Sequence, residues 1–386
     1  MARKFGKPRH VKTGIINYNL MLLGVGGVGK TTMFKNILDK VAGSDGYMFL
    51  EFNEFGADTI EGIPAEDVDS WEGYYDMLDN YVYGYEDIVN DIIENKATDY
   101  KNLKVVVWDT LDGFIRIAQD EALALWNKKH PDKKTDTLNA TWGGFKGPSD
   151  KVKEIMLDSM KKLNKVGVKV WCIGHTATKD VIDSKTGDAY TTLTANIQQT
   201  YFNFWKEKMD ICGTVYINRE LGKEKTNRKN IMTKKDIERT VVKKESRVVV
   251  FRDDNYSIDS KSRFRDISGE IEFNPDEPEK FIEVIENAIK EAIKHGNGNY
   301  AEAKKEEMSK NKEVEKEVEK MKKKKKRKKE IDDISKKIIN FIVENKDTEK
   351  EKVKEIVVAS KELNLDLKNM DVDDLDKAKK VLSIIE

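Results

Sequence analysis

The chain has 386 residues, of which 38% are hydrophobic and 36% are charged. This length predicts two or three domains, and the apolar content suffices for one α/β core. Lysine plus arginine and aspartate plus glutamate balance at 70 each, so net charge points to no class of partner. The two cysteines lie far apart in apolar runs, which excludes a disulfide framework, and no apolar run is long enough to span a membrane. A cytoplasmic protein is expected.

Residues 1–14 form a basic N-terminal arm that contains no acidic residue. Its five basic residues are Arg3, Lys4, Lys7, Arg9 and Lys12. Such an arm is either a solvated tail or a contact for nucleic acid.

The stretch from Gly24 to Thr31, GVGGVGKT, fits the phosphate-binding pattern G-x-x-x-x-G-K-[ST]. Residues 17–23 precede it as a predicted buried strand, and residues 30–41 follow it as a predicted amphipathic helix. Glycines let backbone N–H groups point inwards, and the helix N-terminus adds partial positive charge for the phosphates. In this arrangement Lys30 reaches the β- and γ-phosphates, and the Thr31 hydroxyl holds Mg²⁺. The predicted nucleotide-binding residues are Gly24, Val25, Gly26, Gly27, Val28, Gly29, Lys30, Thr31 and Thr32.

Two further predicted strands end in acidic residues. Residues 46–54 end in acids, and a glutamate here could orient the attacking water: Glu54 is the first candidate and Glu51 the second. A solvated strand end is the alternative interpretation. Residues 102–110 form a continuous apolar run, which is typical of a strand buried on both faces in a parallel sheet. This strand ends in Asp109, where P-loop enzymes place the carboxylate that holds Mg²⁺ through water.

Residues 168–174 form another predicted buried strand, and His175 follows it. A polar side chain there can contact the γ-phosphate, or it can be a structural group. Two polar loops are predicted, over residues 128–148 and 176–196. The first ends in aromatic residues, glycines and a lysine at positions 142–146, which suit either base stacking on single strands or an aromatic anchor for the loop.

Basic residues gather in two later segments. Residues 219–247 lie between two predicted strands and hold eleven Lys or Arg against five acids, which fits a phosphate contact or a solvated hairpin. A charged linker is predicted over residues 296–330, and its residues 322–329 are eight consecutive basic residues. Residues 331–386 regain apolar periodicity and predict a small helical domain of about three short helices, which binds a partner or DNA.

The order of these segments resembles that in RecA-like phage ATPases, AAA-type nucleotide-binding proteins of which some pair or anneal single-stranded DNA. The resemblance covers residues 15–295. It rests on GVGGVGKT, the acid-ended strand at Glu54, VVVWDT, CIGHT, the late strand pair and SKSRF. It implies an α/β fold with a RecA-like P-loop NTPase core and a mainly parallel sheet, followed here by the small C-terminal helical module.

The resemblance also implies roles for single residues. Lys261 and Arg263 lie in a segment similar to the Lys-Asn-Arg-Phe motif of RadA-type relatives, whose basic residues reach the nucleotide of a neighbouring subunit. A homo-oligomer is therefore expected, with hydrolysis that depends on assembly. His175 matches a sensor of the γ-phosphate. The implied catalytic residues are Glu54, Lys30, His175, Lys261 and Arg263, and the implied metal residues are Thr31 and Asp109.

The function implied by the resemblance is an ATP-hydrolysing, Mg²⁺-dependent, DNA-associated enzyme of the phage recombination or annealing type. Its location would be the bacterial host cell if the chain is phage-encoded. Single-stranded DNA is the favoured partner, a phage or host replication or recombination protein would bind residues 331–386, and no membrane is expected. Neither predicted DNA-contacting loop is strongly basic, which leaves DNA contact there open. The alternatives are a replication helicase or loader, a P-loop kinase of a small molecule, and a non-hydrolysing scaffold that uses ATP as a switch.

Overall fold

The computed structural model describes most of the chain in two compact units, Met1–Lys312 and Glu313–Glu386. The predicted boundaries at residues 295 and 330 stay a prediction. The described residues are 10–52, 56–71, 74–75, 81–183, 185–229, 236–252, 259–296, 298–346, 348–363, 365–367, 370 and 374–385.

The first unit is built on a sheet in which eight strands follow the order β12-β10-β9-β1-β7-β6-β2-β3. Neighbouring strands from β9 to β3 are parallel, whereas β10 and β12 continue the sheet antiparallel. The predicted mainly parallel α/β fold is therefore confirmed. The strands on this path are β1 (Leu20–Gly24), β2 (Tyr47–Glu51), β3 (Ala65–Asp67), β6 (Val105–Asp109), β7 (Lys169–Ile182), β9 (Ile211–Lys229), β10 (Asp236–Val250) and β12 (Glu270–Glu272). Off it lie β8 (Ala189–Ala195), β11 (Lys261–Ser262) and the separate pair β4 (Tyr74–Tyr75) and β5 (Tyr81–Val82).

Helices cover both faces of this sheet, which explains why β1 and β6 are buried along their whole length. Apolar side chains of α1 and α6 share one core with alternate residues of the central strands. On the other face Trp108 of β6 stacks on Phe114 of α3 and on Trp205 of α5. The helices of this unit are α1 (Lys30–Val41), α2 (Tyr85–Asn95), α3 (Leu111–Lys129), α4 (Gly147–Lys165), α5 (Gln199–Lys206) and α6 (Glu279–His295), with short 3-10 turns η1 (Ile15–Asn17), η2 (Ser44–Gly46), η3 (Ala57–Thr59), η4 (Pro131–Lys133) and η5 (Leu138–Ala140).

The register of the parallel strands brings the predicted site residues to one edge of the sheet. Gly24, the last residue of β1, lies opposite His175 of β7. Glu51 at the end of β2 lies opposite Asp109 at the end of β6. One strand, β7, separates the P-loop strand from the strand that carries Asp109. The sheet therefore places the P-loop, Asp109, Glu51 and His175 at its carboxyl edge.

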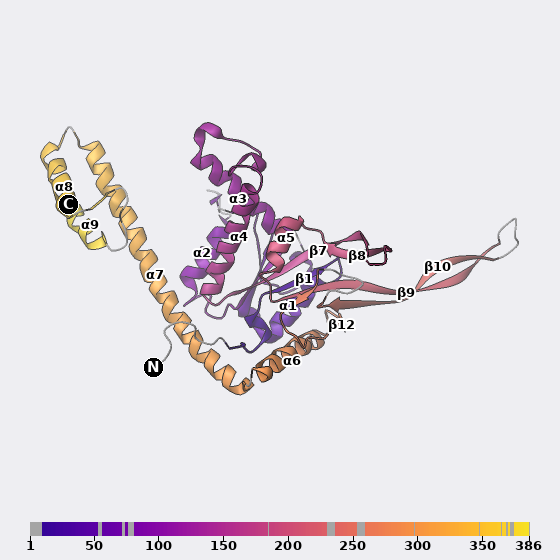
Figure 1. Ribbon diagram of the computed structural model, residues 1–386. Helices are drawn as coiled ribbons and strands as arrows, with labels where there is room; N and C mark the ends of the chain where they lie inside the picture. Colours follow the sequence, from indigo (N-terminus) through magenta and orange to yellow (C-terminus); the bar gives the residue numbers. More distant parts are fainter. Residues whose placement is uncertain are drawn as a thin grey trace. The chain divides into compact units, whose positions relative to one another are not determined.

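Two β-hairpins extend strands of this sheet, and only one of them contradicts its prediction. The predicted loop over residues 176–196 is wrong, because β7 continues to Ile182 and pairs antiparallel with β8. Its threonines are β-branched and favour strands, although their polarity suggested a loop. Within the basic segment, residues 219–229 belong to β9 and residues 236–247 belong to β10. The two strands pair antiparallel and extend beyond the sheet as a long hairpin, as the segment's interpretation as a hairpin expects (Figure 1).

The second unit is helical. Its core joins isoleucines of α7 to Ile356 of α8 and Val381 of α9. This confirms the predicted C-terminal helical module. No helix among the described residues is long and apolar enough to cross a membrane. The helices are α7 (Tyr300–Glu344), which begins in the first unit, α8 (Lys350–Glu362) and α9 (Leu375–Leu382).

Candidate nucleotide-binding site

The P-loop connects β1 to α1 and uses glycine conformations that other residues rarely adopt. Gly27 and Gly29 have φ angles of 73° and 97°. A Cβ added at Gly29 would lie 2.6 Å from the Cγ of Pro275, so this position requires glycine on two grounds. The carbonyl of Gly29 then accepts the first helical bond of α1, from the N–H of Met33 at 2.9 Å. The loop is thus held directly at the N-terminus of a helix, where anions bind favourably.

Lys30 lies buried inside this loop. Its Nζ donates hydrogen bonds to the carbonyl oxygens of Gly24 and Val25, both at 3.0 Å. The ammonium group therefore lies inside the P-loop, and its charge is stabilised by carbonyl dipoles. Phosphate oxygens are stronger acceptors for an ammonium group than neutral carbonyls.

Thr31 and Asp109 are brought together across β7. The Thr31 hydroxyl donates to Oδ2 of Asp109 at 2.8 Å, and the carboxylate is buried at the end of β6. A hydroxyl and a carboxylate are oxygen ligands of the kind that Mg²⁺ binds, together with waters and substrate phosphates. Within the described ranges no group of three or more His, Cys, Asp or Glu forms a metal site of its own. The pair therefore fits a Mg²⁺ ion that completes its coordination with the nucleotide and water.

Of the two candidate glutamates, only Glu51 is among the residues that the structure describes. Glu54 lies outside the described residues. Glu51 is 2% exposed, and its Oε1 accepts a hydrogen bond from the backbone N–H of Ala57 at 2.7 Å. Burial raises the pKa of the Glu51 carboxyl to about 7; the bond from Ala57 lowers it, while the negative charge of Asp109 raises it further. A carboxyl with this pKa exchanges protons readily near neutral pH.

His175 lies half-buried beside the start of the P-loop, and its surroundings fix the backbone on which it sits. Its carbonyl accepts a hydrogen bond from the N–H of Asn196 at 2.8 Å. The preceding residue in β8, Ala195, donates its N–H to Oδ2 of the buried Asp259 at 2.7 Å, and Thr194 Oγ1 donates to the same oxygen at 2.7 Å. Asp259 therefore connects the C-terminal end of β8 to the segment that leads into Lys261.

Lys261 and Arg263 lie at the opposite edge of the sheet from the P-loop of their own chain. β11 pairs with Cys212 and Ile211, at the amino end of β9. Lys261 Nζ donates to the carbonyls of Lys206 and Met209 at 2.9 and 3.2 Å. Arg263 donates to the carbonyl of Glu207 at 2.8 Å and forms an ion pair of 3.3 Å with Asp210. The structure thus does not bring them to Lys30, and their action on a neighbouring subunit remains a prediction.

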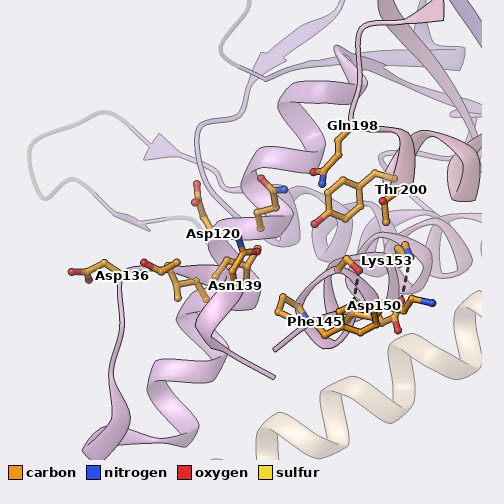
Figure 2. A pocket seen from close by; sticks show the side chains of 16 residues that line it. Asp120, Asp136, Asn139, Phe145, Asp150, Lys153, Gln198 and Thr200 are labelled. Atoms are coloured by element: carbon orange, nitrogen blue, oxygen red, sulfur yellow. Dashed lines mark hydrogen bonds and ion pairs between the residues drawn. The ribbon is translucent and has the colours of Figure 1, made fainter. Parts of the chain in front are cut away.

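The aromatic segment at residues 142–146 combines an anchored ring with an exposed one. Trp142 donates its indole N–H to the carbonyl of Ala122 at 3.0 Å. Phe145 is 95% exposed, and its φ angle of 48° is unusual for a residue other than glycine. Phe145 lies at a polar hollow of about 830 Å³ between α3, the loop around Asn139 and the N-terminal ends of α4 and α5 (Figure 2).

Arg247 is a residue near the site that sequence reasoning missed. It belongs to β10, and its Nη1 donates to the carbonyl of Val28 in the P-loop at 3.3 Å. In the sequence it is one of eleven basic residues in a charged segment, and nothing separates it from the others. Only the pairing of Arg247 with Ile217 of β9, next to the P-loop strand, places it there.

The fold and this site define a P-loop nucleoside triphosphatase. Residues 16–264 match the family model of the AAA domain, and the chain belongs to this family. One similar solved structure is a KaiC-like protein from the hyperthermophilic archaeon Pyrococcus horikoshii OT3, with 14% identity over 69% of this chain and 99% of that chain and a TM-score of 0.33. A similarity of this size adds nothing to the family assignment. No curated protein matches the chain.

Proposed function

We propose that this protein is a Mg²⁺-dependent ATPase that acts with DNA in recombination or annealing of the phage type. The observation that carries the proposal is the bond of 2.8 Å between Thr31 and Asp109 beside the loop that encloses Lys30. Thr31 and Asp109 would hold Mg²⁺, which neutralises charge on the phosphates. Lys30 supplies a second positive charge, which the carbonyls of Gly24 and Val25 hold in position.

A carboxylate is also needed to orient the attacking water and to accept its proton. Glu51 supports this step through its place beside Asp109 and its raised pKa of about 7. Deprotonated Glu51 would accept the proton as the water attacks the γ-phosphate. Glu54 remains the other candidate. His175 opposite Gly24 is proposed to contact the γ-phosphate.

Single-stranded DNA is the proposed partner of the segment at residues 142–146. Exposed aromatic rings stack on bases regardless of sequence, and Phe145 projects such a ring with Lys146 next to it in the chain. A homo-oligomer is proposed as the working form, with Lys261 and Arg263 reaching the nucleotide of a neighbouring copy.

An assay of ATP hydrolysis with and without single-stranded DNA tests this function. We expect Mg²⁺-dependent turnover that DNA accelerates, and a loss of about 100-fold or more in Lys30→Ala because a preorganised charge is removed. Lys35→Ala is the matched control, since Lys35 lies on the same helix and pairs with Asp39. Its turnover should stay within about twofold of the parent, as is usual for a surface ion pair.

The ATPase assay tests the association with DNA and the hydrolysis of ATP separately. Turnover that single-stranded DNA never changes would remove DNA from the function. ATP binding without any turnover would favour a scaffold that uses ATP as a switch.

A further inference from the structure

The second unit carries an unbroken run of eight basic residues, Lys322–Lys329, which we name the basic tract. The tract lies within α7, and every one of its side chains is exposed. An α-helix turns once every 3.6 residues, so eight successive charges surround the helix axis completely. The nearest acid after the tract, Glu330, is engaged with Lys379 of α9 at 2.6 Å.

The charge density of the tract matches that of duplex DNA. A helix rises about 1.5 Å per residue, which gives one positive charge for every ~1.5 Å of axis. Duplex DNA carries one negative charge for every ~1.7 Å. The β9–β10 hairpin is less charged, because Arg219 pairs with Glu245 and Arg239 pairs with Glu224 along it. Of these two basic segments, the tract is the stronger ligand for a polyanion.

Repulsion between the like charges of the tract favours the binding of an anion. Residues three and four positions apart are neighbours on a helix, and every such pair in the tract has the same charge. Like charges at this spacing destabilise a helix, so α7 is weakened at the tract unless counterions gather there. A bound polyanion would relieve the repulsion and raise the helix content of α7.

The chemistry of the tract favours nucleic acid over a membrane surface. A helix that lies on a membrane needs an apolar face opposite its charged one, and residues 322–329 have none. No aromatic residue occurs between positions 301 and 340, so the tract cannot stack on bases. Phosphates are therefore its ligand, without base or sequence preference.

We propose that the basic tract binds the phosphate backbone of duplex DNA independently of sequence, and that this contact stabilises the helix of α7 against the repulsion within the tract. This proposal rests on the proposed association with DNA, and it assigns duplex contact to the second unit. It differs from the proposed stacking of single strands on Phe145, which belongs to the first unit.

Duplex binding by the full chain, measured over a range of salt concentrations, tests the proposal. The tract variant carries Lys322→Gln, Lys324→Gln, Lys326→Gln and Lys328→Gln, and glutamine keeps the helix because its helix propensity is close to that of lysine. If all four lysines meet phosphates, the slope of log Kobs against log salt becomes shallower by about 3 to 4. The control variant removes four exposed lysines that lie among glutamates of the same helix: Lys304→Gln, Lys305→Gln, Lys310→Gln and Lys312→Gln. Its slope should change by less than about 1.

Circular dichroism at 222 nm supplies a second readout. Added duplex should raise the helix signal of the parent and of the control variant, and should leave the tract variant nearly unchanged. Anionic vesicles should raise it in none of the three. A tract variant with the parent's slope, or a vesicle response as large as the DNA response, overturns the proposal.

The two proposals fail in different ways. If the parent binds duplex through the tract but its turnover ignores DNA, the DNA-dependent ATPase fails and the tract stands. If DNA accelerates turnover equally in parent and tract variant and their slopes agree, the tract fails alone. A parent that binds no DNA overturns the tract and the DNA association together.

Discussion

Glu51 combines two properties that separate it from the other acids around the P-loop. It is buried at the end of β2, and the N–H of Ala57 holds its carboxylate in one orientation. Burial raises its pKa to about 7, so a large fraction is protonated below that pH. If Glu51 accepts the proton from water, turnover should fall as the pH drops below about 7, because only the carboxylate form can accept it.

Substitution of Glu51 and of Glu54 tests which glutamate accepts the proton from water. Glu51→Gln should lower kcat by about 100-fold or more if Glu51 is the proton acceptor, which is within the usual contribution of a general base. Glu54→Gln is the matched control, and the larger loss of the two identifies the catalytic carboxylate. Equal and small losses in both would contradict a glutamate base in this strand.

The raised pKa of Glu51 also predicts how the stability of Glu51→Gln, relative to the parent, changes with pH. A folded-state pKa raised from 4.5 to about 7 means that the folded protein binds this proton more tightly than the unfolded chain. The stabilisation is therefore complete below pH 4.5 and is lost as the pH rises through 7. Glu51→Gln should unfold at the same temperature as the parent at pH 4 and be more stable at pH 8, by about 1–3 kcal/mol. Thermal unfolding at both pH values checks this.

At the scale of single elements, two aromatic residues of the segment at 142–146 are expected to have different roles: Trp142 holds the segment in place, and Phe145 contacts DNA. Phe145→Ala should leave the free energy of unfolding within about 0.5 kcal/mol of the parent, because the ring is 95% exposed. It should weaken binding of single-stranded DNA by about 1–3 kcal/mol if the ring stacks on a base. Fluorescence anisotropy with a labelled oligonucleotide measures this loss.

Trp142→Ala provides the contrast on the same segment. Its indole N–H bond to the carbonyl of Ala122 would be lost, so the variant should be less stable than the parent by about 1–3 kcal/mol. Unchanged DNA binding in Phe145→Ala, with Trp142→Ala destabilised, would make the segment purely structural.

The elements differ in how far the sequence predicts them. The helix over residues 30–41 is predictable because its apolar residues recur at helical spacing after a glycine loop. The buried strands β1 and β6 are predictable because their apolar runs are continuous. The β7–β8 hairpin is not, since its many threonines are polar and its pairing is formed across a turn that carries no apolar signal.

The residues of the site likewise divide into those that a local sequence pattern predicts and those that only long-range contacts bring to the site. The P-loop and Asp109 are local patterns at the ends of predicted strands. The contacts of Arg247 with the P-loop and of Asp259 with β8 join residues far apart in the chain. Such contacts follow from strand order, which the periodicity of a single segment does not contain.

For the whole molecule, the central prediction is that the active site needs two copies of the chain. Lys30→Ala and Arg263→Ala should each be inactive alone, and a mixture should recover part of the activity because some interfaces pair an intact P-loop with an intact Arg263. Arg265→Ala is the control, since Arg265 is exposed two residues away. Turnover of the mixture against each variant alone measures this, and a mixture as inactive as its parts would place the complete site within one chain.

The position of β7 between the P-loop strand and the Asp109 strand has a mechanical consequence. The pair formed by Thr31 and Asp109 closes over this strand, and the same strand continues without a break for seven residues beyond His175, to Ile182. At about 3.3 Å per residue this extension is roughly 23 Å long. The strand that separates Thr31 from Asp109 is therefore also the backbone of the β7–β8 hairpin, so a partner bound at the hairpin tip would be connected to the site by one continuous strand.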